Sequence, residues 1–193
     1  VNQGQIIGRN FLDFCVEEKV IVEIKKGNNF SKSNIDPLCN NATITGSGSV
    51  RVTSAAFLIT GGSIVGSILN QGTISSNSYA IKFGNPVGAT ITGGIVNYGS
   101  IYGSTGIYLT AGTYSGGITN YGTVDASSEA ISLSKGKYSG GLVNTGLVRG
   151  AGSSSSSSFA LAAGAVFTGG LLNQGTFQVS YTGSSTGYAV IRN

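Results

Sequence analysis

Two carboxylates and a lysine near the start of the chain have the types and spacing that could bind a metal ion. Residues 11–16 and 20–25 alternate along the chain, which predicts two strands joined by a Glu-Glu-Lys turn. Folding them as a hairpin places Asp13 opposite Glu23, with Lys25 on the same face. Two opposed carboxylates repel each other in a sheet unless a cation lies between them. That cation could be Lys25 or a divalent metal ion.

These three residues also resemble the Asp, Glu-x-Lys set of the PD-(D/E)xK nuclease-like superfamily. The segment IIGRNFLDFCVEEKVIVEIKKGNNFSKSNID at 6–36 resembles the small GxxExxY branch of that group. The resemblance implies that Asp13 and Glu23 would hold Mg²⁺ and that Lys25 would orient or activate the attacking water. The helices that flank the motif in that branch have no counterpart, because PLCNNATIT runs directly into a repeat region. A Mg-dependent nuclease-like module, or a remnant of one, fused to that region is therefore the alternative interpretation.

The amino-acid composition excludes several other kinds of catalytic and binding site. The chain has no His, so Ser-His-Asp and Cys-His catalysis are not available. Cys15 and Cys39 could form one disulfide or remain two thiols. The 11 Lys and Arg are scattered against 7 Asp and Glu, so no nucleic-acid partner is expected. No apolar run approaches the roughly 18 residues of a membrane helix, so no membrane insertion is expected. We expect no cofactor, no metal and no enzymatic activity.

Self-similarity dominates the rest of the sequence. Five segments share the core apolar-x-Asn-x-Gly-x-apolar, of which GGITNYGTV at 116–124 is one copy. The repeated asparagines are Asn70, Asn97, Asn120, Asn144 and Asn173. A second apolar element follows each copy, as in YAIKF at 79–83 and AISL at 130–133. A two-part pattern with a period of about 23–29 residues is typical of a solenoid, in which each repeat is one coil.

We therefore predict an all-β fold, a parallel β-solenoid (β-helix) with an atypical N-terminal β-hairpin cap. Residues 1–41 would form the charged cap segment and residues 42–193 a solenoid of about five or six coils. Inward positions should stack in two apolar files. One file would contain Ile74, Ile101, Val124, Val148 and Phe177, and the other Ile81, Ile107, Ile131, Leu161 and Val190.

Polar and glycine residues recur at the predicted corners. The asparagine side chains should point inward and bond corner backbone groups or the asparagine of the next coil, and a ligand-binding row is the alternative. A glycine two residues after each asparagine suits a corner with positive φ. These glycines are Gly72, Gly99, Gly122, Gly146 and Gly175.

The two ends of a solenoid expose strand edges, which are usually capped by a polar segment. Residues 1–36 hold 10 of the 18 charged residues, so the hairpin is interpreted as such a cap. Its apolar face could cover the first coil, and a bond between Cys15 and Cys39 could pin it there. Tyr98 and Tyr121 occupy matching positions in the repeat, either as ordinary strand residues or as a surface that stacks on sugars or partners.

The stretch GGITNYGTV…EAISLSKGKYSGGLVN resembles the repeats of autotransporter-type passenger domains and related bacterial surface adhesins, and the resemblance covers about residues 42–193. It implies a secreted or surface-displayed β-helix. We expect a structural, non-catalytic extracellular protein that acts as a surface stalk, adhesin segment or filament subunit. Its expected partners are further copies, joined end to end through open solenoid edges, and host or matrix glycans or proteins. A carbohydrate-binding adhesin is a further alternative.

Overall fold

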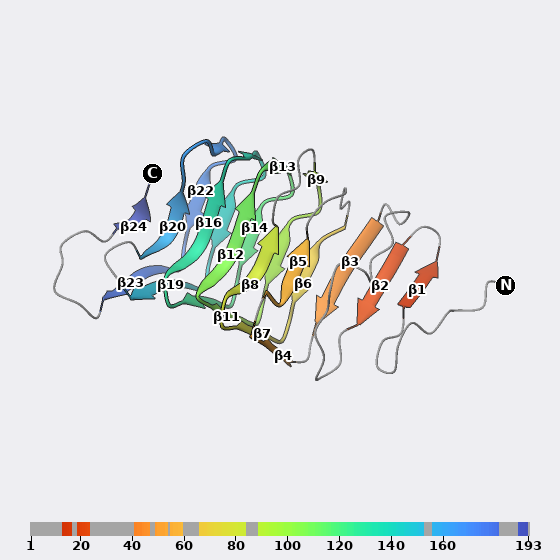
Figure 1. Ribbon diagram of the computed structural model, residues 1–193. Coiled ribbons are helices and arrows are strands. Elements are labelled where there is room, and N and C mark those ends of the chain that lie inside the picture. Colours follow the sequence, from red (N-terminus) through yellow and green to blue (C-terminus); the bar gives the residue numbers. More distant parts are fainter. Residues whose placement is uncertain are drawn as a thin grey trace.

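The computed structural model describes residues 13–16, 19–23, 41–46, 49–53, 55–59, 66–83, 89–152, 156–181 and 189–192. All regular structure in these residues is β-strand, and the strands stack as a parallel β-solenoid (Figure 1). In this part of the chain, no helix is long and apolar enough to cross a membrane. The predicted fold class is confirmed.

Twenty-two strands of the described chain form the coils. The first coil has β3 (Asn41–Gly46), β4 (Ser49–Val52) and β5 (Phe57–Ile59). The second has β6 (Ile68–Asn70), β7 (Thr73–Ser76), β8 (Tyr79–Phe83) and β9 (Ala89–Ile91). The third has β10 (Ile95–Asn97), β11 (Ser100–Gly103), β12 (Thr105–Thr110) and β13 (Gly112–Tyr114). The fourth has β14 (Ile118–Asn120), β15 (Thr123–Ala126), β16 (Glu129–Ser134) and β17 (Lys137–Tyr138).

The fifth coil has β18 (Leu142–Asn144), β19 (Leu147–Gly152), β20 (Ser157–Leu161) and β21 (Val166–Phe167). The sixth has β22 (Leu171–Asn173), β23 (Thr176–Tyr181) and β24 (Ala189–Arg192). Strands at equivalent places in successive coils pair in parallel to form four sheets. Sheet A runs β3-β6-β10-β14-β18-β22, sheet B β4-β7-β11-β15-β19-β23, sheet C β5-β8-β12-β16-β20-β24 and sheet D β9-β13-β17-β21. The second to fifth coils contribute to all four sheets, which gives about four complete turns.

The first predicted apolar file lies along sheet B. Ile101 pairs with both Ile74 and Val124, and Val148 continues the file to Phe177. The first four side chains are at most 4% exposed, and Phe177 packs against the core from the last coil. Equivalent inward positions in successive coils thus fill the interior. Strands of only two to six residues are stable because they stack on the coils beside them.

The second predicted file, along sheet C, is correct for three members and wrong beyond them. Ile107 pairs with Ile81 and Ile131, as expected. Ile131 then pairs with Phe159, whereas Leu161 pairs with Leu133. Phe159 in turn pairs with Ile191 instead of Val190. A shift of two residues keeps the same face of a strand inward, so the larger phenyl ring fills the place predicted for Leu161.

The N-terminal hairpin continues sheet A. β1 (Asp13–Val16) pairs antiparallel with β2 (Lys19–Glu23), and β2 pairs in parallel with β3, so that sheet A has the order β1-β2-β3-β6-β10-β14-β18-β22. In Figure 1 the two strands extend the sheet beyond the first coil. The hairpin therefore meets the solenoid through strand-to-strand pairing, not by laying one face over the coil as the sequence suggested.

Candidate functional site

The most regular polar feature of the interior is the file of repeated asparagines along sheet A. Each asparagine is the last residue of its strand and lies directly opposite the next one in the parallel register. The four side-chain bonds run from Asn70 Nδ2 to Asn97 Oδ1 at 2.7 Å, from Asn97 to Asn120 at 2.7 Å, from Asn120 to Asn144 at 2.8 Å and from Asn144 to Asn173 at 2.8 Å. All five asparagines predicted from the repeat therefore lie in one chain of hydrogen bonds.

The same amides also bond the corner backbone. Asn97 Nδ2 donates to the carbonyl oxygens of Gly99 at 3.2 Å and Thr123 at 3.1 Å, and the other inner members repeat this pattern. Asn97 and Asn120 are 0% exposed. Buried amides with their donors and acceptors engaged in this way stabilise the coil-to-coil contact and leave no side-chain group facing a ligand.

The glycine two residues after each asparagine is required for a different reason than predicted. The glycines with positive φ in the described chain do not include Gly99, Gly122, Gly146 or Gly175. A Cβ added at Gly122 would instead lie 2.0 Å from the carbonyl oxygen of Gly99. The corner backbones of successive coils are therefore in direct contact, and a side chain cannot fit between them.

Positive φ occurs at other glycines of the repeat, which were not predicted from the sequence to need it. Four of the five repeats begin with a Gly-Gly pair, whose second member has φ 81° at Gly94, 73° at Gly117, 78° at Gly141 and 79° at Gly170. These residues turn the chain from sheet D into sheet A. The signal that could have identified them is the Gly-Gly pair before Ile95, Ile118, Leu142 and Leu171.

Two tyrosines stack inside the solenoid near sheet D. The rings of Tyr114 and Tyr138 lie 4.8 Å apart at 11°, and both side chains are buried. The Tyr138 hydroxyl donates to the carbonyl oxygen of Leu109 at 2.7 Å, and Tyr114 to that of Thr110 at 2.9 Å. Burial raises the pKa of both hydroxyls well above the ordinary value for tyrosine. Sequence reasoning did not distinguish this pair from the surface tyrosines.

A small apolar cavity adjoins the buried tyrosine pair. It measures about 20 Å³, and its lining includes Tyr114, Tyr138, Leu109 and Leu133. A space of this size holds about one water molecule. It is therefore a packing gap of the solenoid core and not a pocket for a substrate.

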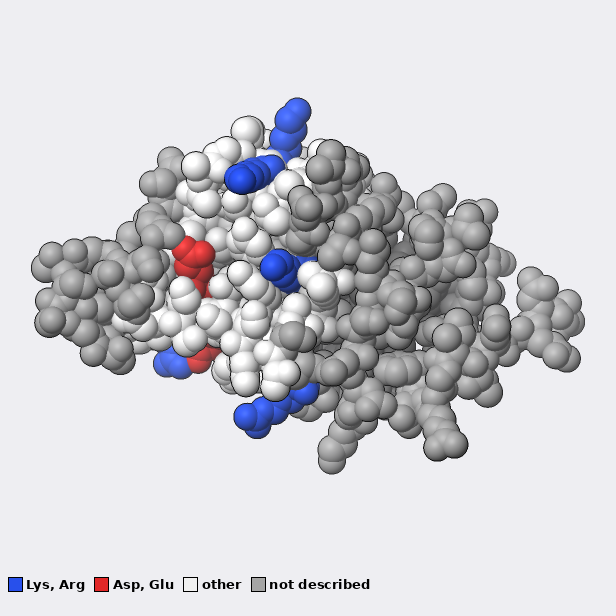
Figure 2. Space-filling view, viewed as in Figure 1, with Lys and Arg blue, Asp and Glu red and all other residues white. Residues whose placement is uncertain are grey.

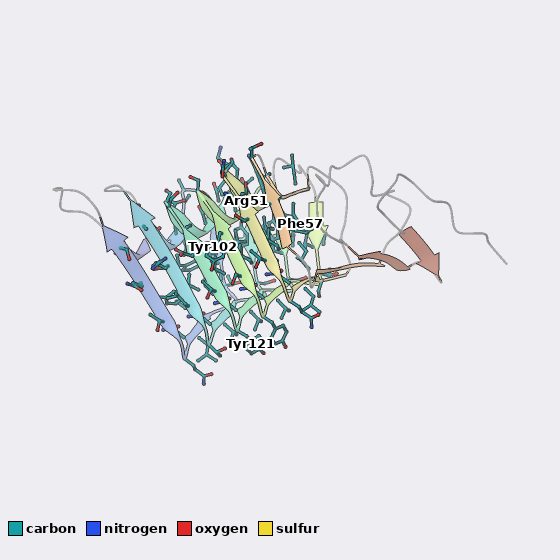
Figure 3. The ribbon with its side chains drawn as sticks, turned by 90° about the horizontal axis from the view of Figure 1, so that it is seen from below. Arg51, Phe57, Tyr102 and Tyr121 are labelled. Carbon is teal, nitrogen blue, oxygen red and sulfur yellow. The ribbon has the colours of Figure 1, made fainter. Side chains whose placement is uncertain are left out.

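The surface tyrosines form a second stack. Tyr98 and Tyr121 lie at the corner between sheets A and B, with ring centroids 4.7 Å apart and planes at 7°. They are 55% and 48% exposed, and Figure 3 shows Tyr121 at the margin of the molecule. Each ring covers one face of the other.

Charged side chains on the described surface form local contacts. Arg149 binds Asp125, directly opposite it on the neighbouring strand, through two hydrogen bonds, one of them 2.9 Å from Nε to Oδ1. The Nζ of Lys82 lies 4.1 Å from the ring centroid of Tyr79 and 5.8 Å from that of Tyr108. Figure 2 shows a few charged side chains scattered over a mostly uncharged surface, with one blue group next to a red one at the lower edge.

The carboxylates of the hairpin are not opposed in the manner predicted. The β1–β2 register pairs Asp13 with Val22 and Val16 with Lys19, one residue away from the register that would place Asp13 opposite Glu23. Lys25 and Cys39 lie outside the described residues, so neither the proposed cation nor the Cys15–Cys39 bond is placed. Among the described residues, no three His, Cys, Asp or Glu side chains lie close enough together to hold a metal ion.

Comparisons with known protein families, with curated proteins and with solved structures gave no match to this chain.

Proposed function

We propose that this chain is a structural, non-catalytic β-solenoid that acts outside the cell as a surface stalk, adhesin segment or filament subunit. The observation that carries the proposal is the asparagine file, which bonds every coil from the second to the sixth to its neighbour. The buried amides join successive coils into a rod, and they are not directed toward a substrate. A rod of this kind displays whatever lies on its four outer faces.

The edge of the sixth coil supports end-to-end association. Leu171 of β22 is 37% exposed, whereas Leu142, the residue that pairs with it one coil earlier, is 1% exposed. Asn173 accepts a hydrogen bond from Asn144, and β22 is the last described strand of sheet A. Among the described strands, none lies beyond β22 to accept a hydrogen bond from the Asn173 side-chain amide, as the next asparagine does in the earlier coils. An added coil, from a second copy or from continuing chain, would bury Leu171 and extend the asparagine file.

An Asn173→Asp chain tests this association. The aspartate keeps the Oδ1 that accepts from Asn144 but loses the donor and places a charge at the open edge. The matched control is Gln174→Glu, which adds the same charge at the adjacent exposed residue, outside the file. We expect concentration-dependent particles of increasing length in light scattering and electron microscopy for the unmodified chain and the control, and loss of length for Asn173→Asp. Unmodified chains that stay one solenoid long at high concentration contradict end-to-end association.

A carbohydrate-binding adhesin is a second candidate, supported by the exposed Tyr98–Tyr121 stack. Exposed aromatic rings bind sugars through their apolar faces. On a glycan array, the unmodified chain should bind some glycans, and Tyr98→Ala should lose that binding. The control is Tyr102→Ala, on the face of sheet B seen in Figure 3, which should keep it. An array without any signal from the unmodified chain argues against this candidate.

A further inference from the structure

Two stacked tyrosine pairs in the third and fourth coils differ chiefly in their exposure to solvent. Tyr98 and Tyr121 lie at equivalent corners, with ring centroids 4.7 Å apart and planes at 7°. Tyr114 and Tyr138 have nearly the same geometry, with centroids 4.8 Å apart and planes at 11°. The first pair is about half exposed, whereas the second is buried. The same arrangement of rings is thus present once in solvent and once in the core.

The backbone beside the exposed pair holds the two rings together. The amide of Tyr121 donates to the carbonyl oxygen of Asn97 at 2.8 Å, and the amide of Thr123 donates to that of Gly99 at 2.9 Å. The flanking strands pair in parallel, and such strands repeat at about 4.8 Å, close to the separation of the ring centroids. The spacing of the coils therefore sets the spacing of the rings.

Two stacked phenols in solvent have the geometry for oxidative coupling. A one-electron oxidant removes the hydroxyl hydrogen of a tyrosine and leaves a radical with spin on the oxygen and on both ortho ring carbons. Two such radicals form one bond between their ortho carbons, and each coupled carbon then loses its hydrogen as a proton while its phenol oxygen regains one. Two ring radii and one carbon–carbon bond place the centroids of the coupled rings about 4.3 Å apart, so the stacked rings must turn but hardly need to approach.

We propose that Tyr98 and Tyr121 are the site of an intramolecular dityrosine cross-link, formed by a haem peroxidase with hydrogen peroxide. Each phenol loses one hydrogen atom in total, and one hydrogen peroxide is reduced to two water molecules. The new carbon–carbon bond joins the third coil to the fourth. This modification uses the exposed stack without any bound ligand, and it does not depend on where the protein acts.

The buried pair is not a site for this chemistry, although its rings are equally close. The Tyr138 hydroxyl donates to the Leu109 carbonyl oxygen at 2.7 Å, and the Tyr114 hydroxyl to that of Thr110 at 2.9 Å. A peroxidase outside the molecule does not reach these hydroxyls, and the packed core resists the turn of the rings that coupling requires. Tyr121, by contrast, lies at the margin of the molecule, where an enzyme can approach it (Figure 3).

The cross-link would tie together two coils that hydrogen bonds and packing otherwise hold. Like a disulfide, it would close a loop, here one coil long, and so restrict the unfolded chain. We expect the cross-linked chain to melt at a temperature higher by about 5 °C or more.

The test treats the full chain at low concentration with a haem peroxidase and hydrogen peroxide. Dityrosine fluorescence, a denaturing gel and mass spectrometry of protease fragments identify the product. The unmodified chain should give a product of single-chain size, lighter by two hydrogen atoms, with the bond between Tyr98 and Tyr121. Tyr98→Phe and Tyr121→Phe keep the stacked rings and should lose this product. The matched control is Tyr102→Phe, which removes the hydroxyl of another exposed tyrosine in the third coil and should retain it.

Four outcomes would contradict the proposal. Dityrosine that maps to Tyr114 and Tyr138, or that persists within single chains of Tyr98→Phe, would overturn the assignment of the site. A covalent dimer as the only product would show that the bond joins different chains. An unmodified chain without any dityrosine, under conditions that couple free tyrosine, would exclude the cross-link. A cross-linked chain that melts at the same temperature as the untreated chain would show that the bond does not tie the coils together.

Discussion

The side-chain Nδ2 of Asn97 donates a 2.7 Å hydrogen bond to Oδ1 of Asn120, the residue directly opposite it on the next strand of sheet A. Both amides are fully buried. Parallel, in-register pairing makes such a bond possible, because each amide has a donor on one side of the coil and an acceptor on the other. We therefore expect an asparagine inside the file to contribute more to the free energy of unfolding than the asparagine at its end.

Asn120→Ala should lower the free energy of unfolding by about 3 kcal/mol or more. The substitution leaves the amide nitrogen of Asn97 and the amide oxygen of Asn144 without their side-chain partners in a buried site, and each such loss costs about 1–3 kcal/mol. The measurement is urea unfolding followed by circular dichroism.

The matched control for Asn120→Ala is Asn173→Ala in the sixth coil, where the side chain is exposed. Water can replace the bond that Asn144 loses there, so we expect a decrease of about 1 kcal/mol or less. Equal decreases at the two positions would show that burial of the amide does not determine its contribution.

Gly122→Ala should destabilise the solenoid more than Gly170→Ala, although only Gly170 has positive φ. A Cβ at Gly122 would lie 2.0 Å from the Gly99 carbonyl oxygen, so two corners must separate, at a cost of about 3 kcal/mol or more. A Cβ at Gly170 meets no atom within 4 Å, and the left-handed backbone alone costs about 1–2 kcal/mol. Thermal melting of both variants gives the order, and a larger decrease for Gly170→Ala would contradict the close-contact explanation.

The residues in these two pairs of substitutions also illustrate which features of the fold could be predicted from the sequence and which could not. The period of the repeat predicted the solenoid, the asparagine file and the apolar file of sheet B, because stacking in register places equivalent residues together. The offset of Gly122 from Asn120 indicated that glycine is needed there. It did not say whether the reason is positive φ or contact between coils, since both exclude a side chain.

Register was predicted less well than fold. Val20, Ile21 and Val22 are consecutive apolar residues, so alternation does not fix the hairpin pairing to within one residue, and Asp13 lies opposite Val22. In β20, Phe159 and Leu161 are two residues apart, and either could fill the core position. The structure places Phe159 there.

Stability should fall at high pH because Tyr114 and Tyr138 are buried as neutral hydroxyls. Burial raises the pKa of both in the folded state, so the unfolded chain loses these protons first. Their contribution is therefore complete below about pH 10 and is lost as the pH rises above that value, by up to about 1.4 kcal/mol per pH unit for each tyrosine. Urea unfolding between pH 8 and 11 measures this decrease.

Tyr114→Phe provides the decisive comparison for the pH dependence. The variant retains the ring that stacks on Tyr138 at 4.8 Å and loses one hydrogen bond to the Thr110 carbonyl oxygen. It should start less stable at pH 8 but lose less stability per pH unit above pH 10, since one buried ionisable group is gone. Tyr121→Phe removes an exposed hydroxyl and controls for the loss of a tyrosine. A Tyr114→Phe curve parallel to that of the unmodified chain would mean that the buried hydroxyl does not cause the alkaline loss.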